Sequence, residues 1–223
     1  MYLIKYLKLF KPLILSFFMY FGNDLDNYFG KIGGLILMYG PSTSGKSTFA
    51  MQSSLQFAKK GKVLFLDTER SFAIDRIKLM DPNYKKILEN IIVLNIKDFD
   101  DQVEKLKHIE ELVKKGKFSY VIIDSFGNFY RHALHSKEYT EVNEQAVLML
   151  RSLKHIVEMG IPVLITNQVY ETQKGEIKTV GGTMIRNFSD SIIELELEPR
   201  NIKVHKPEED NIAFKLDNSG LIF

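Results

Sequence analysis

Gly40-Pro41-Ser42-Thr43-Ser44-Gly45-Lys46-Ser47 matches the phosphate-binding loop G-x-x-x-x-G-K-[ST] at every fixed position, and this match determines the fold class. The apolar run at 34–39 predicts a buried strand before the loop, and the sequence at 48–60 predicts a helix after it. This strand, loop and helix order is the context that the motif requires. We therefore predict that a nucleoside triphosphate binds at Gly40, Pro41, Ser42, Thr43, Ser44, Gly45, Lys46, Ser47 and Thr48.

The residue types in this loop suit a phosphate chain and its cation. Gly40 and Gly45 let the backbone curl until its N–H groups face an anion, at the positive end of the following helix. The ammonium group of Lys46 would reach the β- and γ-phosphates, and the hydroxyl group of Ser47 would coordinate Mg²⁺. The loop thus predicts ATP and Mg²⁺ as the bound species.

The composition is ordinary for a globular protein. The chain has 223 residues, enough to bury one substantial core. It is 45% hydrophobic and 26% charged, and it has no cysteine, which excludes disulfides and thiolate zinc sites and fits a cytoplasmic protein. The net charge of +2 produces no overall basic field, so a nucleic-acid site would have to be local.

The first 21 residues differ from the rest of the chain. The segment 1–21 is apolar and basic, but its apolar run at 13–21 is shorter than the ~20 residues that span a bilayer, so we expect no stable membrane span. Three interpretations stay open: an over-extended reading frame that starts instead at Met19, an interfacial anchor or partner-binding arm, and a signal peptide. We predict an extension at 1–21 and a single core at 22–223.

Strands and helices alternate after residue 34. Short continuous apolar runs indicate strands that are buried on both faces, which is typical of a parallel sheet. These predicted strands are 34–39, 62–67, 91–96, 120–124 and 162–166. Helical spacing of apolar residues predicts helices at 98–115 and 146–157. Beyond residue 189 the pattern has period two, which predicts short antiparallel strands at 192–197, 202–205 and 212–216.

Acidic residues end two of these strands, at the edge where sites collect in open α/β sheets. Asp124 would hold Mg²⁺ through water or hydrogen-bond to Ser47, and the alternative is a carboxylate that only caps a turn. Glu69 would orient and deprotonate the water that attacks ATP, and the alternative is an ion pair with Arg70 or Arg76.

An amide ends the last of the parallel strands, in Thr166-Asn167-Gln168. Gln168 could contact both the γ-phosphate and the loop that follows, and so detect ATP. The alternative is a strand-end amide that satisfies nearby backbone groups.

These pieces, taken together, resemble the ATPase core of the RecA/RadA recombinases, and within that superfamily the small archaeal RadB-type paralogues. The resemblance covers most of 24–223, in the order and with the spacing of the family. The matching segments are Gly40–Ser47, Leu66–Glu69, Val121–Ser125, Thr166–Val169 and Gly181–Gly182.

The resemblance implies a RecA-like core that hydrolyses ATP weakly, with Lys46, Glu69 and Gln168 as its catalytic residues. It implies a role in homologous recombination and DNA repair, in which the protein binds single-stranded DNA and assists a RadA-type recombinase or a junction nuclease. It also places two DNA-facing loops at 128–141 and 170–180. A homo-oligomer is possible, because 207–210 falls near the segment that covers ATP across a subunit interface in the family.

Two departures from the family limit these expectations. The chain has neither the N-terminal helix-hairpin-helix domain nor the Phe-x-x-Ala motif that tethers the next subunit in a full recombinase, so we do not expect long filaments. No arginine finger is evident, and such a residue can supply ~10³–10⁵ in rate, so we expect slow hydrolysis.

The two candidate DNA loops carry cations beside aromatic residues, a combination that can follow a phosphate backbone and stack on unpaired bases. The alternative is a polar connection whose aromatic residues pack on the sheet. Two histidines in the first loop suggest no metal, because no third ligand is evident. The predicted DNA-binding residues are Arg131, His132, Lys137, Lys174 and Lys178.

Other functions remain open for the same core. One is a KaiC-like signalling ATPase, and another is a nucleotide-gated interaction module that does not bind DNA. A nucleoside kinase is disfavoured, because the sequence has no arginine-rich lid.

Overall fold

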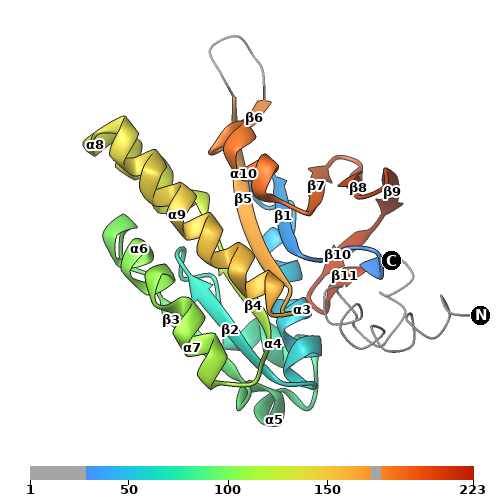
Figure 1. Ribbon diagram of the computed structural model, residues 1–223. Coiled ribbons are helices and arrows are strands. Elements are labelled where there is room, and N and C mark those ends of the chain that lie inside the picture. Colours follow the sequence, from blue (N-terminus) through green and yellow to red (C-terminus); the bar gives the residue numbers. More distant parts are fainter. Residues whose placement is uncertain (1–28, 172–176) are drawn as a thin grey trace, which may run out of the picture.

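The computed structural model describes residues 29–171 and 177–223, and a twisted sheet forms its centre (Figure 1). The strands are β1 (Leu35–Gly40), β2 (Lys62–Asp67), β3 (Ile91–Asn95), β4 (Phe118–Asp124), β5 (Val163–Glu171), β6 (Ile177–Thr179), β7 (Ser191–Leu197), β8 (Arg200–Lys206), β9 (Asp210–Ala213), β10 (Lys215–Asp217) and β11 (Gly220–Ile222). The helices are α3 (Lys46–Ala58), α4 (Ile74–Met80), α5 (Tyr84–Leu88), α6 (Phe99–Lys107), α7 (Ile109–Lys115), α8 (Gly127–Ser136), α9 (Tyr139–Glu158) and α10 (Gly182–Phe188).

The main sheet has nine strands, eight of them in the order β3-β2-β4-β5-β1-β7-β8-β9, with β6 paired to β5. The neighbours from β3 through β7 pair in parallel, whereas β8 and β9 continue the sheet in antiparallel fashion. The predicted fold class, an α/β core with a mostly parallel sheet and antiparallel strands at its C-terminal end, is confirmed.

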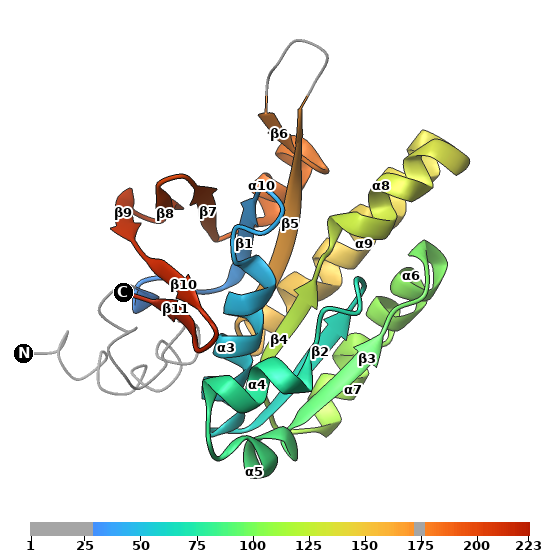
Figure 2. The ribbon, with the colours of Figure 1, turned by 180° about the vertical axis from the view of Figure 1, so that it is seen from behind.

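Helices cover both faces of the sheet. The helices α6 to α10 pack on one face (Figure 1), and α3, α4 and α5 pack on the other with the β10–β11 hairpin (Figure 2). In β1, Leu35 and Leu37 join the core on the α9 side, while Ile36 and Met38 join the core on the α3 side. This double burial explains why the parallel strands are continuous apolar runs in the sequence.

The structure divides two elements that the sequence predicted as continuous. The predicted helix at 98–115 is two helices, α6 and α7, which meet at His108 and both contact α9. Its predicted cap is present, because the Asp98 side chain accepts a hydrogen bond from the backbone N–H of Asp101. The predicted strand at 212–216 is divided between β9 and β10, on either side of the buried Phe214.

The strand at 192–197 was predicted to be antiparallel, and this prediction was wrong for one of its two neighbours. The strand β7 pairs in parallel with β1 and only its other neighbour, β8, is antiparallel. The reason is the helix α10, which carries the chain back across the sheet before β7 begins, as parallel pairing requires.

The predicted DNA-facing loop at 128–141 was also wrong as a loop, because α8 and the start of α9 occupy it. Tyr130 and Ala133 lie three residues apart on α8 and are buried against the sheet core, with Phe129 and Leu134 partly buried beside them. Burial of this apolar stripe favours a helix over an irregular connection.

Residues 1–28 and 172–176 lie outside the described part of the chain, so the predicted extension at 1–21, its boundary with the core, and Lys174 lie outside it too. Among the helices of the described ranges, none combines the length and the apolar character that a membrane crossing needs.

Candidate nucleotide-binding site

A cavity of about 450 Å³ lies at the carboxyl edge of the parallel strands. The structure brings Lys46, Ser47, Glu69, Asp124 and Gln168 together in its lining, although these residues come from four separate places in the sequence. Of the other predicted nucleotide-binding residues, Ser42, Thr43, Gly45 and Thr48 line the cavity too, whereas Gly40, Pro41 and Ser44 shape the loop from behind it.

The two loop glycines are each required by the geometry. A Cβ atom on Gly40 would lie 2.3 Å from the carbonyl oxygen of Leu195, so a larger residue would push the loop away from β7. Gly45 has a φ angle of 112°, in the region that favours glycine, and it immediately precedes the first turn of α3. The N–H groups of that first turn have no partner within their own helix, which leaves them free to bind an anion.

Lys46 lies within the curl of the loop. Its ammonium group donates to the carbonyl oxygens of Gly40 at 2.9 Å and Pro41 at 2.6 Å. Burial lowers the pKa of this ammonium group below its ordinary value, and the carboxylates of Asp124 and Glu69 oppose that shift. A bound phosphate chain would favour the charged form further, so this position suits an anionic ligand.

Asp124 is buried at the tip of β4 and accepts several hydrogen bonds. Thr166 Oγ1 donates to it at 2.5 Å and Ser71 Oγ donates at 2.6 Å, and the Ser47 side chain also hydrogen-bonds to it. Burial raises the pKa of the Asp124 carboxyl group above its ordinary value, and these three hydrogen bonds act in the opposite direction. The predicted contact between Asp124 and Ser47 is therefore present.

The buried carboxylate of Asp124 predicts a stability effect that can be measured. We expect Asp124→Asn to raise the melting temperature of the nucleotide-free protein at pH 7 by about 2–4 °C, which corresponds to about 1 kcal/mol in a chain of this size. The raised pKa means that the folded state binds this proton more tightly than the unfolded state, so the ionised carboxylate lowers stability at pH 7. This cost falls as the pH drops through the folded-state pKa.

The measurement is thermal unfolding of both proteins at several pH values between 7 and 4, without nucleotide or divalent cation. The advantage of the variant should shrink toward acid pH. A variant that is less stable than the parent protein at pH 7 would contradict this account of Asp124.

Glu69 lies at the rim of the cavity and is hydrogen-bonded to residues at the carboxyl ends of two other strands, β4 and β5. Its Oε1 atom accepts hydrogen bonds from Ser125 Oγ at 2.6 Å and from Gln168 Nε2 at 3.0 Å. Both bonds reach the same oxygen, so Oε2 can accept a proton from water. Within the described residues Glu69 forms no ion pair, and Arg76 donates instead to Thr48 Oγ1 at 2.7 Å.

The turn that presents Glu69 is built by Asp67. One carboxylate oxygen of Asp67 accepts from the backbone N–H groups of Glu69 and Ser71, and the other accepts from Phe72 N at 3.0 Å. Such local hydrogen bonds from an aspartate fix the backbone of a turn. The strand tip therefore holds its glutamate in one orientation.

A second cavity, of about 350 Å³, lies between α8 and the end of β5. Arg131, His132 and His135 line it with Asn128, and Gln168 lines this cavity as well as the first. The guanidinium group of Arg131 also lies 5.9 Å from the centre of the Tyr170 ring. Two of the predicted DNA-binding residues, Arg131 and His132, are thus brought together beside the amide predicted to detect ATP.

Of the other predicted DNA-binding residues, the two within the described ranges, Lys137 and Lys178, do not line this cavity. Lys137 follows α8 and forms an ion pair with Asp100 on α6, with its ammonium group 6.0 Å from the centre of the Phe99 ring. Lys178 lies on β6 opposite Tyr170, in the hairpin that β5 and β6 form. The hairpin occupies the described part of the second predicted loop, 170–180.

Sequence reasoning missed four polar residues of the site. Ser71 and Thr166 bind Asp124, Ser125 binds Glu69, and Arg76 lies in the cavity lining beside Thr48. A signal existed for Thr166 and Ser125, because each neighbours a predicted site residue at a strand tip. Ser71 and Arg76 belong to no motif, and only the fold carries them to the cavity.

The donor set fits a magnesium-bound triphosphate. Mg²⁺ prefers oxygen ligands, and proteins usually hold it with one or two carboxylates together with substrate phosphates. Ser47 and Asp124 supply such oxygens at the cavity, next to the loop N–H groups and Lys46. Residues 29–171 and 177–223 contain no cluster of three acidic, histidine or cysteine side chains suited to a metal, and this arrangement does not need one.

Comparison with known proteins gives consistent matches. The sequence model of the Rad51 family matches residues 34–219. A protein named "DNA repair and recombination protein RadB" from Methanosphaera stadtmanae is 30% identical over 218 residues, which are 90% of this chain and 93% of that protein. Proteins of the same name from Pyrococcus furiosus and Methanococcus maripaludis are 30% identical over 202 residues and 33% identical over 195 residues. These cover 85% and 82% of this chain, and 86% and 89% of the respective relatives.

Proposed function

This chain belongs to the Rad51 family, and on that premise we propose that it binds ATP with Mg²⁺, hydrolyses it slowly, and binds single-stranded DNA in recombination and repair. One observation carries the proposal: a single cavity unites the phosphate loop, the buried carboxylate of Asp124, and Glu69 hydrogen-bonded to Gln168. Members of the family are generally ATPases, and the names of the relatives state DNA repair and recombination.

Each residue has a distinct task in the proposed reaction. The loop N–H groups and Lys46 bind the phosphates and hold the γ-phosphoryl group in place. Ser47 and Asp124 would hold Mg²⁺, which would neutralise part of the negative charge of the phosphates. Glu69 Oε2 accepts a proton from the attacking water, and the hydrogen bonds from Ser125 and Gln168 hold the carboxylate in position.

Slow turnover follows from the cations at the site. Of the two arginines near the loop, Arg76 is bonded to Thr48, and Arg200 donates to backbone carbonyl oxygens of the loop. Neither is directed by these bonds toward a transferring phosphoryl group. A residue that acts as an arginine finger can supply ~10³–10⁵ in rate, and because neither of these two arginines in the described residues is placed to act as one, we expect a low basal rate.

The second cavity supports the DNA part of the proposal. Arg131 and His132 line it, and the guanidinium group of Arg131 lies beside the exposed ring of Tyr170; a cation with an aromatic face is the combination that binds phosphate and base in single strands. Gln168 joins this cavity to Glu69, so ATP and DNA would influence each other through one amide. We extend the proposal to a RadA-type recombinase or a junction nuclease as the protein that this ATPase assists.

A fluorescence-anisotropy titration with a labelled single-stranded oligonucleotide tests DNA binding. We expect binding at low salt, and we expect Arg131→Ala to weaken it by about threefold to tenfold, because one cation–phosphate contact is lost. In a plot of the logarithm of the DNA association constant against the logarithm of the salt concentration, the slope should become less steep by about 0.7. Arg151→Ala is the matched control, since Arg151 is an exposed arginine on α9 that lies outside this cavity.

Unchanged anisotropy with the parent protein at low salt would remove the DNA part of the proposal. It would favour a KaiC-like ATPase or a nucleotide-gated interaction module instead. Equal losses in Arg131→Ala and Arg151→Ala would place the DNA elsewhere on the surface.

A further inference from the structure

The β7–β8 hairpin forms the support behind the phosphate loop. The carbonyl oxygen of Leu195 on β7 faces Gly40 so closely that no side chain fits between them, and the Leu195 side chain faces Gly45. Two residues further along β7, Leu197 pairs with Arg200, the first residue of β8. Arg200 is thereby held at the carbonyl side of the loop, opposite the side on which a phosphate would bind.

The guanidinium group of Arg200 contacts the loop directly. Its Nη1 atom lies 3.4 Å from the carbonyl oxygen of Thr43 and 3.3 Å from that of Ser44, and the side chain is half-buried. The other cations of β8 have different partners: Lys203 pairs with Glu196, and Lys206 donates to the carbonyl oxygen of Ser189. Arg200 is thus distinguished from the rest of its strand by this contact with the loop.

Because the peptide bond is planar, this contact also fixes the direction of the N–H group in the same peptide. In a trans peptide the C=O and N–H groups point in opposite directions. When Arg200 fixes the carbonyl group of Ser44, it therefore directs the N–H group of Gly45 the other way, and Gly45 lines the cavity. The positive charge of the guanidinium group, next to the carbonyl oxygen, also polarises the peptide group and makes its N–H a stronger hydrogen-bond donor.

We propose that Arg200 is a positioning residue for nucleotide binding, which acts through the phosphate loop and not on the phosphates themselves. This inference rests on the proposed function, because it needs a nucleotide in the cavity. The N–H groups of such loops hold the α- and β-phosphates, which ATP and ADP share. Loss of Arg200 should therefore lower the affinity for ATP and for ADP by the same factor, and it should leave the rate of the chemical step unchanged.

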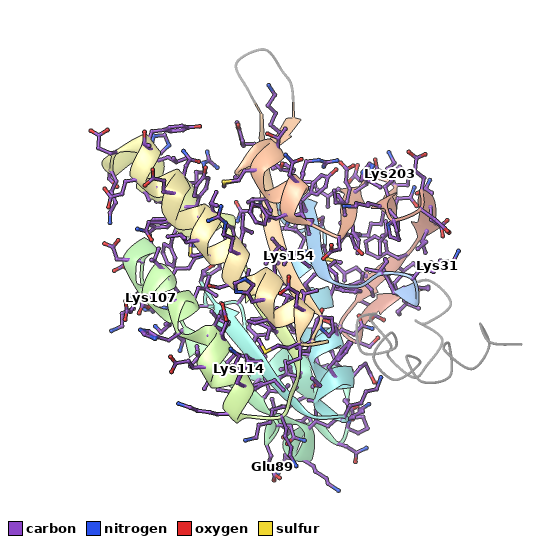
Figure 3. The ribbon with its side chains drawn as sticks, viewed as in Figure 1. Lys31, Glu89, Lys107, Lys114, Lys154 and Lys203 are labelled. Carbon is purple, nitrogen blue, oxygen red and sulfur yellow. The ribbon has the colours of Figure 1, made fainter. Side chains whose placement is uncertain are left out.

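The test compares Arg200→Met with the parent protein, using fluorescence titrations of Mg-ATP and Mg-ADP and steady-state ATP hydrolysis. We expect both dissociation constants to rise by about fivefold to tenfold, because hydrogen bonds from a charged but half-exposed donor such as Arg200 contribute at the lower end of their range. KM should rise by a similar factor while kcat stays within about twofold. Lys203→Met, which removes a cation from the same strand (Lys203 is labelled in Figure 3), should bind both nucleotides like the parent protein.

Arg200→Lys keeps the charge, but it lacks the planar guanidinium group whose Nη1 atom contacts both carbonyl oxygens, so it should show a smaller loss, again equal for both nucleotides. This variant decides the question if Arg200→Met proves unstable in thermal unfolding. Parent-like affinity in Arg200→Lys, a loss confined to ATP, or a fall in kcat at constant affinity would each overturn the role in loop positioning. Failure of the parent protein to bind either nucleotide would instead overturn the proposed function, and this inference with it.

Discussion

Replacing Glu69 with glutamine is expected to lower the rate of ATP hydrolysis by about 10²–10⁴-fold while ATP affinity changes by less than about threefold. The substitution preserves shape, and its amide oxygen can still accept hydrogen bonds from Ser125 and Gln168. An amide, however, cannot remove a proton from water. The expected loss therefore falls on kcat, which separates a catalytic carboxylate from one that only binds or supports the fold.

The measurements are steady-state hydrolysis with Mg-ATP and an independent titration of ATP affinity. Glu89→Gln is the matched control, because Glu89 precedes β3 at the opposite edge of the sheet (Figure 3) and should retain the parent rate. A parent-like rate in Glu69→Gln would show that another group activates the water. A large loss of affinity in the same variant would mean that Glu69 supports the site structurally.

The second large effect is expected at Lys46. Lys46→Ala should weaken ATP binding by about 10²-fold or more, because it removes a buried cation from its phosphate partner in a site of low dielectric. The cation's present partners are the carbonyl oxygens of Gly40 and Pro41, so it stabilises the loop and the ligand with the same group. Hydrolysis should fall below detection at ATP concentrations that saturate the parent protein.

Lys59→Ala is the control for Lys46→Ala. Lys59 follows the last turn of the same helix, α3, and pairs with Asp81 at the far end from the loop. It should bind ATP like the parent protein. If Lys46→Ala keeps parent affinity while its melting temperature is unchanged, then the nucleotide does not bind at this loop, and the assignment of the cavity fails.

The parallel core and the phosphate loop were predictable because their signals are local. A strand that is buried on both faces is a continuous apolar run, as in Lys62–Asp67, where the predicted and observed bounds coincide. The loop motif fixes backbone and side chains within eight residues, so its shape needs little from the rest of the chain. The strand-tip residues Glu69 and Asp124 were predictable for a related reason, because parallel strands bring their carboxyl ends to one edge.

Only the tertiary structure decided features that depend on distant packing. The sequence could not separate β7 from an antiparallel strand, because direction depends on how α10 returns the chain and not on the residues of the strand. The helix at 127–136 was hidden for a similar reason: the family resemblance placed a loop there, and only the tertiary structure shows Tyr130 and Ala133 buried against the core.

The same division holds within the site. The sequence alone predicted a loop with the phosphate-binding motif, two acidic strand tips and a strand-end amide. It could not establish that Ser71 and Thr166 bind Asp124, or that Arg200 reaches the loop from 156 residues away in the sequence. A motif consists of residues that are adjacent in the sequence, whereas a hydrogen bond between two strands depends on the register and twist of the whole sheet.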